Sequence, residues 1–231
     1  MAAVVITGAS RGIGLELTRQ YAADGDHIFA LCRNPKTSDK LKAVGERYPG
    51  HITTLTLEVT DEAQLAEAVR AIGDIPVDIL INNAGFNPPF ETQTFLEMDL
   101  DVWRDTFETM TIAPFRIGQA FLGKLMKAKQ PKLVTISSEL CSSIWQTPVL
   151  IAYGSAKAAL NRTWQAVAME LKDKNVIVLP IHPGLVKTDM SGPWGVLEVE
   201  DAVAGVRNVI ARATMADSGK FYQWDGQIHP W

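Results

Sequence analysis

Tyr153 and Lys157 are spaced as a pair of side chains that could move a proton. They lie four residues apart in a stretch whose pattern predicts a helix over Ile151–Lys172, so both side chains face the same way. A phenol has a pKa of about 10 in water, which is high for proton transfer near neutral pH. Because a neighbouring ammonium group stabilises the phenolate, we expect Lys157 to lower the pKa of Tyr153. The pair predicts a general acid and base for interconverting a carbonyl and an alcohol.

A glycine-rich segment with Gly8, Gly12 and Gly14 follows the apolar run at 2–6. The run predicts a strand and the residues from Gly12 predict a helix, so the glycines occupy the turn between them. Glycine permits a tight turn and lets a bulky anion approach the backbone. The free N–H groups and the positive dipole end at a helix start suit a pyrophosphate. The segment predicts a nucleotide site, although its spacing is GxxxGxG rather than the more general GxGxxG.

Four serines within seven residues lie at the end of another apolar run, Lys132–Ser137, which predicts a strand. A hydroxyl there can donate a hydrogen bond to a substrate oxygen and stabilise charge that develops on it. Ser138 is the first candidate, and Ser142 and Ser143 remain alternatives.

Short β-branched runs alternate with longer helical patterns along the chain, and these elements must position the candidate residues. The predicted strands are Ala3–Thr7, His27–Cys32, Ile52–Leu57, Val77–Asn82, Lys132–Ser137, Val176–Ile181 and, more weakly, Lys220–Tyr222. The predicted helices are Gly12–Ala23, Asp39–Arg47, Asp61–Ile72, Asp99–Lys127, Ile151–Lys172 and Val199–Ala213. Strands that are apolar throughout are typical of parallel strands covered on both faces. We therefore expect one α/β domain over 1–231, a Rossmann-type doubly wound parallel sheet of about seven strands with helices on both faces.

The composition excludes several classes of protein. The chain has 231 residues, 47% of them apolar, and a net charge of −4, which argues against disorder and against a basic nucleic-acid-binding surface. Its longest apolar runs are far shorter than the ~20 residues of a membrane span, and no positive segment before the first run indicates a secretory signal. Cys32 and Cys141 are too few and too far apart for a disulfide framework, and the four histidines lack metal-binding spacing. We expect a cytoplasmic protein with reduced thiols and with no metal, nucleic-acid or membrane partner.

Five motifs occur together in one order: TGASRGIG at 7–14, NNAG at 82–85, ISS at 136–138, YGSAK at 153–157, and PG at 183–184 followed by Thr188. By these motifs the sequence resembles the short-chain dehydrogenase/reductase family. Within the family, the segments SSELCSSI at 137–144 and GKFYQWDGQIHPW at 219–231 resemble the carbonyl reductases of the C-factor and sniffer type. The resemblance implies that Tyr153 gives a proton to the carbonyl oxygen while a nicotinamide gives the hydride. It also implies that Lys157 holds the nicotinamide ribose and that Ser138 is the catalytic serine.

The resemblance assigns a nicotinamide cofactor to residues at several predicted strand ends. They are Gly8, Ser10, Arg11, Gly12, Ile13, Gly14, Arg33, Glu58, Val59, Asn83, Ala84, Gly85, Tyr153, Lys157, Pro183, Gly184, Val186 and Thr188. The second predicted strand ends without the acid that would bind a ribose 2′-hydroxyl and select NAD. Arg33 follows that strand, Arg11 can reach the same group, and guanidinium suits a 2′-phosphate. We therefore expect NADP(H) rather than NAD(H). Glu58 and Val59 stand where the family often has an aspartate.

One position departs from the family pattern. The resemblance implies an asparagine in the long central helix, where it completes a proton relay through water, but this sequence has Met110. A thioether cannot donate a hydrogen bond. Thr109 and Thr111 are the adjacent hydroxyls that could stand in for it.

The segment near 189–198 is short, which predicts an open substrate site. Phe86, Cys141, Trp145, Met190 and Trp194 are the candidates to line it. Apolar and aromatic side chains suit a hydrophobic ketone, aldehyde or quinone, with the matching alcohol as product. The resemblance implies a homodimer, through a four-helix contact, or a homotetramer.

Two functions of different classes remain open from the sequence. The first is an NADPH-dependent carbonyl reductase, which would run in reverse as an alcohol dehydrogenase. The second is an NADP(H)-binding sensor or signalling protein with weak or vestigial catalysis, a hypothesis that Met110 motivates. Epimerisation or dehydration of a nucleotide sugar is a third, disfavoured option.

Overall fold

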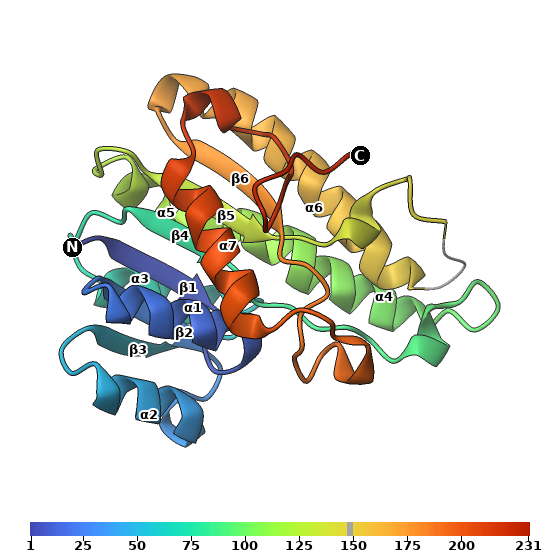
Figure 1. Ribbon diagram of the computed structural model, residues 1–231, viewed down its shortest axis with the longest axis horizontal. Helices are drawn as coiled ribbons and strands as arrows, with labels where there is room; N and C mark the ends of the chain where they lie inside the picture. The colour runs from blue at the N-terminus through green and yellow to red at the C-terminus, as the bar shows by residue number, and fades with distance from the viewer. Residues whose placement is uncertain (147–149) are drawn as a thin grey trace.

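A parallel sheet runs through the centre of the molecule (Figure 1). The computed structural model describes residues 1–146 and 150–231. In that part of the chain the sheet has seven strands in the order β3-β2-β1-β4-β5-β6-β7. They are β1 (Ala3–Thr7), β2 (His27–Cys32), β3 (Ile52–Thr56), β4 (Ile79–Asn82), β5 (Lys132–Ile136), β6 (Ile177–His182) and β7 (Tyr222–Gln223). The parallel sheet of seven strands confirms the expected fold class.

Helices cover both faces of the sheet. They are α1 (Gly12–Ala23), α2 (Asp39–Arg47), α3 (Glu62–Ala71), α4 (Leu100–Phe107), α5 (Ala113–Leu125), α6 (Ile151–Glu170) and α7 (Val199–Arg212). The helices α1, α2 and α7 pack on one face, and α3, α5 and α6 pack on the other (Figure 1). None of the helices in the described residues has the length and apolar character needed to cross a bilayer.

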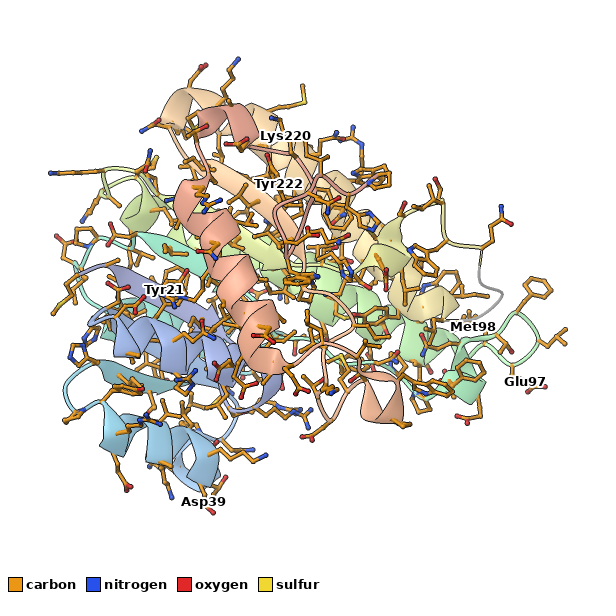
Figure 2. The ribbon with its side chains drawn as sticks, in the orientation of Figure 1. Tyr21, Asp39, Glu97, Met98, Lys220 and Tyr222 are labelled. Carbon is orange, nitrogen blue, oxygen red and sulfur yellow. The ribbon has the colours of Figure 1, made fainter. Side chains whose placement is uncertain are left out.

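Each face of the sheet has its own apolar core. Phe121 and Trp164 are fully buried on the side of α5 and α6, and Leu17 and Val206 are fully buried between α1 and α7. Burying one such side chain contributes about 1.5–3 kcal/mol. Tyr21 extends from α1 under α7, where the Arg207 guanidinium lies 4.4 Å from its ring centroid (Figure 2). The two cores hold the strand ends, and therefore the candidate site residues, at one edge of the sheet.

The helix predicted over Asp99–Lys127 forms as a continuous helical stretch, but it consists of α4, a π-helical turn at Glu108–Ile112 that was not expected, and α5. Pro114 lies in the first turn of α5 and has no N–H, so the carbonyl of Met110 loses its usual donor four residues on. A π-turn accommodates this loss, and such turns are frequent at functional sites.

The last strand also differs from its prediction. It was expected at Lys220–Tyr222 and forms at Tyr222–Gln223, which pairs with Ile181 and His182 of β6. Lys220 lies outside the strand, before Tyr222 (Figure 2), and Phe221 between them is buried. The other strands end within two residues of their predicted limits.

Candidate active site

A large cavity of about 1150 Å³ lies along the carboxyl ends of the central strands. Gly8 after β1, Asn83 after β4, Ser137 after β5 and His182 at the end of β6 all border it. It includes the point between β1 and β4 where the strand order reverses, which is where doubly wound sheets bind ligands. Its volume exceeds the ~300–1,000 Å³ of ordinary ligand pockets, so a nucleotide and a small second molecule fit side by side.

The glycine-rich turn at the start of α1 has the form of an anion site. Gly8 and Gly12 have φ of +69° and +53°, a region that L side chains rarely adopt. Gly14 is packed so closely that a Cβ there would lie 2.3 Å from the Gly8 carbonyl oxygen. No side chain caps α1 and its first turn holds no acid. The first N–H groups of α1 therefore remain free for a phosphate, and the turn fits a dinucleotide.

Asn83 fastens the end of β4 to this turn. Its side-chain Nδ2 donates hydrogen bonds to the carbonyls of Thr7, at 2.9 Å, and Gly8, at 3.3 Å. The Thr7 hydroxyl accepts in return from the backbone N–H groups of Asn83 and Ala84, at 3.0 and 3.1 Å. Thr7 was not singled out in the sequence, because nothing in its motif distinguishes a hydroxyl that holds two loops together.

Ser138 is the serine that the fold brings into the cavity. It begins a 3₁₀ turn at Glu139–Cys141, and its Oγ accepts from the N–H of Leu140 at 3.3 Å. The two alternatives lie outside the cavity lining. The Ser142 Oγ accepts from the N–H of Ile144, and the Ser143 hydroxyl donates to the carbonyl of Trp231. The geometry therefore favours Ser138 among the three.

Tyr153 and Lys157 border the same cavity from the first two turns of α6. The backbone N–H of Tyr153 donates to Oε1 of Gln93 at 3.0 Å, which fixes the start of the helix. The Lys157 ammonium donates to the carbonyl of Ile136 at 2.8 Å and lies 5.8 Å from the Tyr153 ring centroid. The spacing thus places both side chains at one site, as expected.

The expected lowering of the Tyr153 pKa is wrong for this structure. Burial raises the pKa of Tyr153 to about 12, and a contact with the Ser138 hydroxyl opposes that rise only in part. Burial also lowers the pKa of Lys157 to about 8. The physical reason is that desolvation disfavours both charged forms, while the ammonium bonds to a carbonyl instead of the phenol.

Met110 lies in the π-turn and lines the cavity with its side chain almost fully buried. Its sulfur would lie 3.2 Å from a Cβ built on Gly85, so it packs against the loop after β4. Of the two hydroxyls considered as substitutes, Thr109 borders the cavity and Thr111 instead donates to the carbonyl of Ala156 at 2.9 Å.

Arg33 lies after β2 with a side chain that is 70% exposed. Its guanidinium is 3.9 Å from the Glu58 carboxylate, a loose pairing that the sequence did not indicate. Arg11 is exposed on the same cavity lining. Both guanidinium groups are therefore accessible to an anionic ligand bound in the part of the cavity next to β2.

The segment after β6 lies over the glycine-rich turn. Gly184 has a φ of +89°, which turns the chain, and Val186 is buried beneath it. The methyl group of Thr188 would lie 3.4 Å from a Cβ on Gly12. This segment and the glycine-rich turn thus enclose the middle of the cavity. The expected contact residues in this stretch line the cavity: Pro183, Gly184, Val186 and Thr188. Ser10, Ile13, Val59, Ala84 and Gly85 line it as well, whereas Gly14, which packs against Gly8 and Asn83, does not.

Four of the five expected substrate-lining residues border the cavity, namely Phe86, Trp145, Met190 and Trp194. Trp194 is 76% exposed, so the cavity opens to solvent on that side. Cys141 does not line it, which corrects the expectation. The 3₁₀ turn directs its thiol toward α6, where it accepts from Nδ2 of Asn161 at 3.0 Å and burial raises its pKa to about 11.

The structure adds Glu139, Asn87, Asp189 and His182 to the lining. The position of Glu139 directly after Ser138 is the signal in the sequence that could have identified it. His182 is buried at the end of β6. In the described part of the chain, no three His, Cys, Asp or Glu side chains are arranged to hold a metal ion.

Comparisons with known proteins agree with this geometry. A family model described as short chain dehydrogenase matches residues 2–196. A short-chain dehydrogenase of Pyricularia oryzae is 33% identical over 250 residues, covering 99% of this chain and 98% of its own. NADPH-bound carbonyl reductase from chicken fatty liver matches with a TM-score of 0.92 and 31% identity, covering 100% of this chain and 99% of that one. The carbonyl reductase Sniffer of D. melanogaster matches with a TM-score of 0.92 and 26% identity, covering 100% of each chain.

Sequence motifs, strand order and family match therefore agree, and the chain belongs to the short-chain dehydrogenase family of oxidoreductases.

Proposed function

We propose that this protein is an NADPH-dependent carbonyl reductase acting on hydrophobic ketones, aldehydes or quinones, with alcohol oxidation as the reverse reaction. The observation that carries the proposal is the meeting of Ser138, Tyr153 and Lys157 in the cavity that also holds the open N-terminus of α1. The similarity to carbonyl reductases, one of them with NADPH bound, supports it.

A bound reduced nicotinamide supplies the hydride for such a reaction. Tyr153 supplies the proton: with a pKa of about 12 its hydroxyl is protonated at neutral pH, the form needed to donate to a carbonyl oxygen. The Ser138 hydroxyl lies at the same phenol and can donate a second hydrogen bond to that oxygen. Lys157, with a pKa of about 8, is mostly ammonium at pH 7 and stabilises the phenolate left after proton transfer.

Phosphate recognition by arginine supports NADP(H) over NAD(H). Arg11 and Arg33 are exposed on the lining of the end of the cavity near β2, and Glu58 is only loosely paired with Arg33. A 2′-phosphate would gain charge-assisted hydrogen bonds from the guanidinium groups, which a 2′-hydroxyl would not.

The test is NADPH oxidation by the purified protein, followed by absorbance, over a panel of quinones, diketones, aryl ketones and aldehydes. Tyr153→Phe keeps the ring and removes the hydroxyl, so we expect turnover to fall by at least about 100-fold, the typical contribution of general acid catalysis. NADPH binding should persist in this variant. Equal turnover by Tyr153→Phe and wild type would refute the assigned role of the hydroxyl.

Met110 favours a second candidate, an NADP(H)-binding sensor or signalling protein with weak or vestigial catalysis. Its thioether occupies the cavity wall where the family resemblance implies a relay asparagine, and it cannot donate a hydrogen bond. Tight NADPH binding without turnover on any carbonyl compound would support this candidate. Restoration of turnover by Met110→Asn would attribute the loss to the missing relay.

We further propose that the chain works as a single-domain homodimer or homotetramer in the cytoplasm, with the segment near 189–198 bordering the substrate. An apolar groove on α4, lined by Leu100, Trp103, Arg104 and Phe107, supports self-association. Light scattering after size-exclusion chromatography measures the oligomeric state, and a monomer at micromolar concentration would contradict this proposal.

A further inference from the structure

Glu139 places a carboxylate on the cavity wall beside the proposed reaction centre. It directly follows Ser138 and lines the same cavity as Tyr153. Its side chain is 26% exposed. Among the described residues, no group donates a hydrogen bond to its carboxylate, and the nearest cation-forming atom is Nε2 of His182 at 3.7 Å. A partly buried carboxylate with unused acceptor sites therefore belongs to a residue that lines the cavity directly after Ser138.

His182 is held so that it does not satisfy this carboxylate. Its Nδ1 accepts the backbone N–H of Glu139 at 3.2 Å, so the ring proton of the neutral form lies on Nε2. Burial lowers the pKa of His182 to about 4, which keeps the ring neutral. His229 packs edge-on at 5.6 Å between ring centroids, and Phe221 packs against His229 at 4.9 Å. Nε2 of His182 lies 3.7 Å from Oε2 of Glu139, which is longer than a hydrogen bond. The imidazole therefore leaves this carboxylate without a hydrogen-bond donor.

The cavity lining carries few cationic side chains and several acids. In the described part of the lining, the arginines are Arg11 and Arg33, which lie at the end near β2. Lys157 is already bonded to the carbonyl of Ile136. The acids of the described lining are Glu58 beside Arg33, Asp105 in α4, Glu108 in the π-turn, Glu139 after Ser138 and Asp189 after Thr188. Of these acids, Glu139 is the one adjacent in sequence to Ser138, so a second molecule bound beside Ser138 meets its carboxylate first.

We propose that Glu139 selects carbonyl substrates that carry a hydrogen-bond donor next to the carbonyl group, namely α-hydroxy and protonated α-amino ketones, and rejects anionic α-oxo acids. The inference rests on the proposed carbonyl reduction and names the substrate class for it. The donor satisfies the Glu139 carboxylate while the neighbouring carbonyl oxygen meets Ser138 and Tyr153. A carboxylate on the substrate would instead lie close to a like charge in a partly dehydrated cavity, which is unfavourable.

The experiment compares four ketones that share one phenyl ring: acetophenone, α-hydroxyacetophenone, α-aminoacetophenone and benzoylformate. The readout is kcat/KM for each compound divided by kcat/KM for acetophenone in the same protein, which cancels any general change in activity. Wild type, Glu139→Gln and Glu139→Leu are compared. Asp189→Asn, which removes a different acid from the cavity lining, is the matched control.

In wild type, the kcat/KM ratios for α-hydroxyacetophenone (the hydroxy ratio) and α-aminoacetophenone (the amino ratio) should exceed one. The ratio for benzoylformate should fall below one. Glu139→Gln should lower the amino ratio by at least about tenfold, the factor expected for a hydrogen bond to a charged group. Glu139→Leu should lower the hydroxy ratio as well, and both variants should raise the benzoylformate ratio. The ratios in Asp189→Asn should stay within about twofold of wild type, because the proposal assigns no direct contact to Asp189.

Several results would overturn the proposal. Unchanged ratios in both Glu139 variants would show that the carboxylate does not meet the substrate, and an equal effect in Asp189→Asn would assign the selection to net charge. A rise in the KM for NADPH with constant ratios would place the carboxylate against the cofactor. If wild type binds NADPH but reduces none of these compounds or the quinones, carbonyl reduction itself has failed. Affinities of the same four compounds, measured by quenching of NADPH fluorescence, must then still follow the predicted order, and equal affinities would refute the selection.

Discussion

The close packing of Gly14 against the turn before α1 gives a sharp prediction for Gly14→Ala. A Cβ at this position would lie 2.3 Å from the Gly8 carbonyl oxygen and 2.5 Å from Nδ2 of Asn83, whereas real Cβ atoms essentially never approach within 3.0 Å. The oxygen belongs to the backbone, so it cannot move aside by a rotamer change. The substitution must therefore displace the turn or the end of β4.

The magnitude follows from the contacts that this displacement breaks. Overpacking a close-packed site costs about 1–3 kcal/mol. Asn83 donates to Thr7 and Gly8, and losing hydrogen bonds of this kind costs about 1 kcal/mol each. We expect the free energy of unfolding to fall by about 3 kcal/mol, which for a chain of this size lowers Tm by roughly 6–12 °C. The free N–H groups of α1 shift with the turn, so the Kd for NADPH should rise at least about tenfold.

The assay is thermal unfolding by circular dichroism with and without NADPH, together with NADPH titration by fluorescence. Gly45→Ala is the matched control, because a Cβ on Gly45 in α2 would meet no atom within 4 Å. Alanine at a helical position of this kind should raise stability by up to about 1 kcal/mol and leave NADPH binding unchanged. A Gly14→Ala protein with the Tm and NADPH affinity of wild type would refute the steric argument and, with it, the assignment of this turn to the cofactor.

Two further predictions concern single side chains. Arg33→Ala should raise the Kd for NADPH by about tenfold while leaving the Kd for NADH within twofold, because only the 2′-phosphate loses a charge-assisted partner; equal changes in both titrations would contradict the proposed preference. His182→Asn should make the protein less sensitive to acid. Burial lowers the folded-state pKa of His182 from 6.5 to about 4, so the unfolded chain binds the proton first and wild type loses stability as pH falls from about 6.5 toward 4. Urea unfolding at pH 7 and pH 4.5 measures this loss, which should reach about 2–3 kcal/mol in wild type and be smaller in His182→Asn; parallel losses in both would disprove the assignment to His182.

The local motifs were predictable because they depend on short segments of chain. Gly8 and Gly12 adopt the positive φ values that a glycine-rich turn indicates, and Tyr153 and Lys157 meet because four residues make one turn of a helix. The parallel sheet was predictable because its strands are apolar throughout, as burial on both faces requires.

Other features depend on contacts between distant segments, which a single sequence does not display. The π-turn at Glu108–Ile112 joins two helices that a continuous helical pattern had merged. Cys141 was expected at the substrate, but its thiol bonds to Asn161 twenty residues further along the chain. The raised pKa of Tyr153 depends on how deeply the whole cavity wall buries the phenol.

Motif spacing and hydrophobic periodicity are local properties of a chain. The family, the order of strands and helices, and the residues at the strand ends could therefore be predicted from the sequence alone. Three features required the tertiary structure: which of the clustered serines borders the cavity, which charged side chains line it, and the lack of a hydrogen-bond donor to the Glu139 carboxylate among the described residues. The physical reason is that exposure, desolvation and pairing depend on neighbours from β5, β6, α6 and the segment at Phe221–His229, and folding brings these together across the length of the chain.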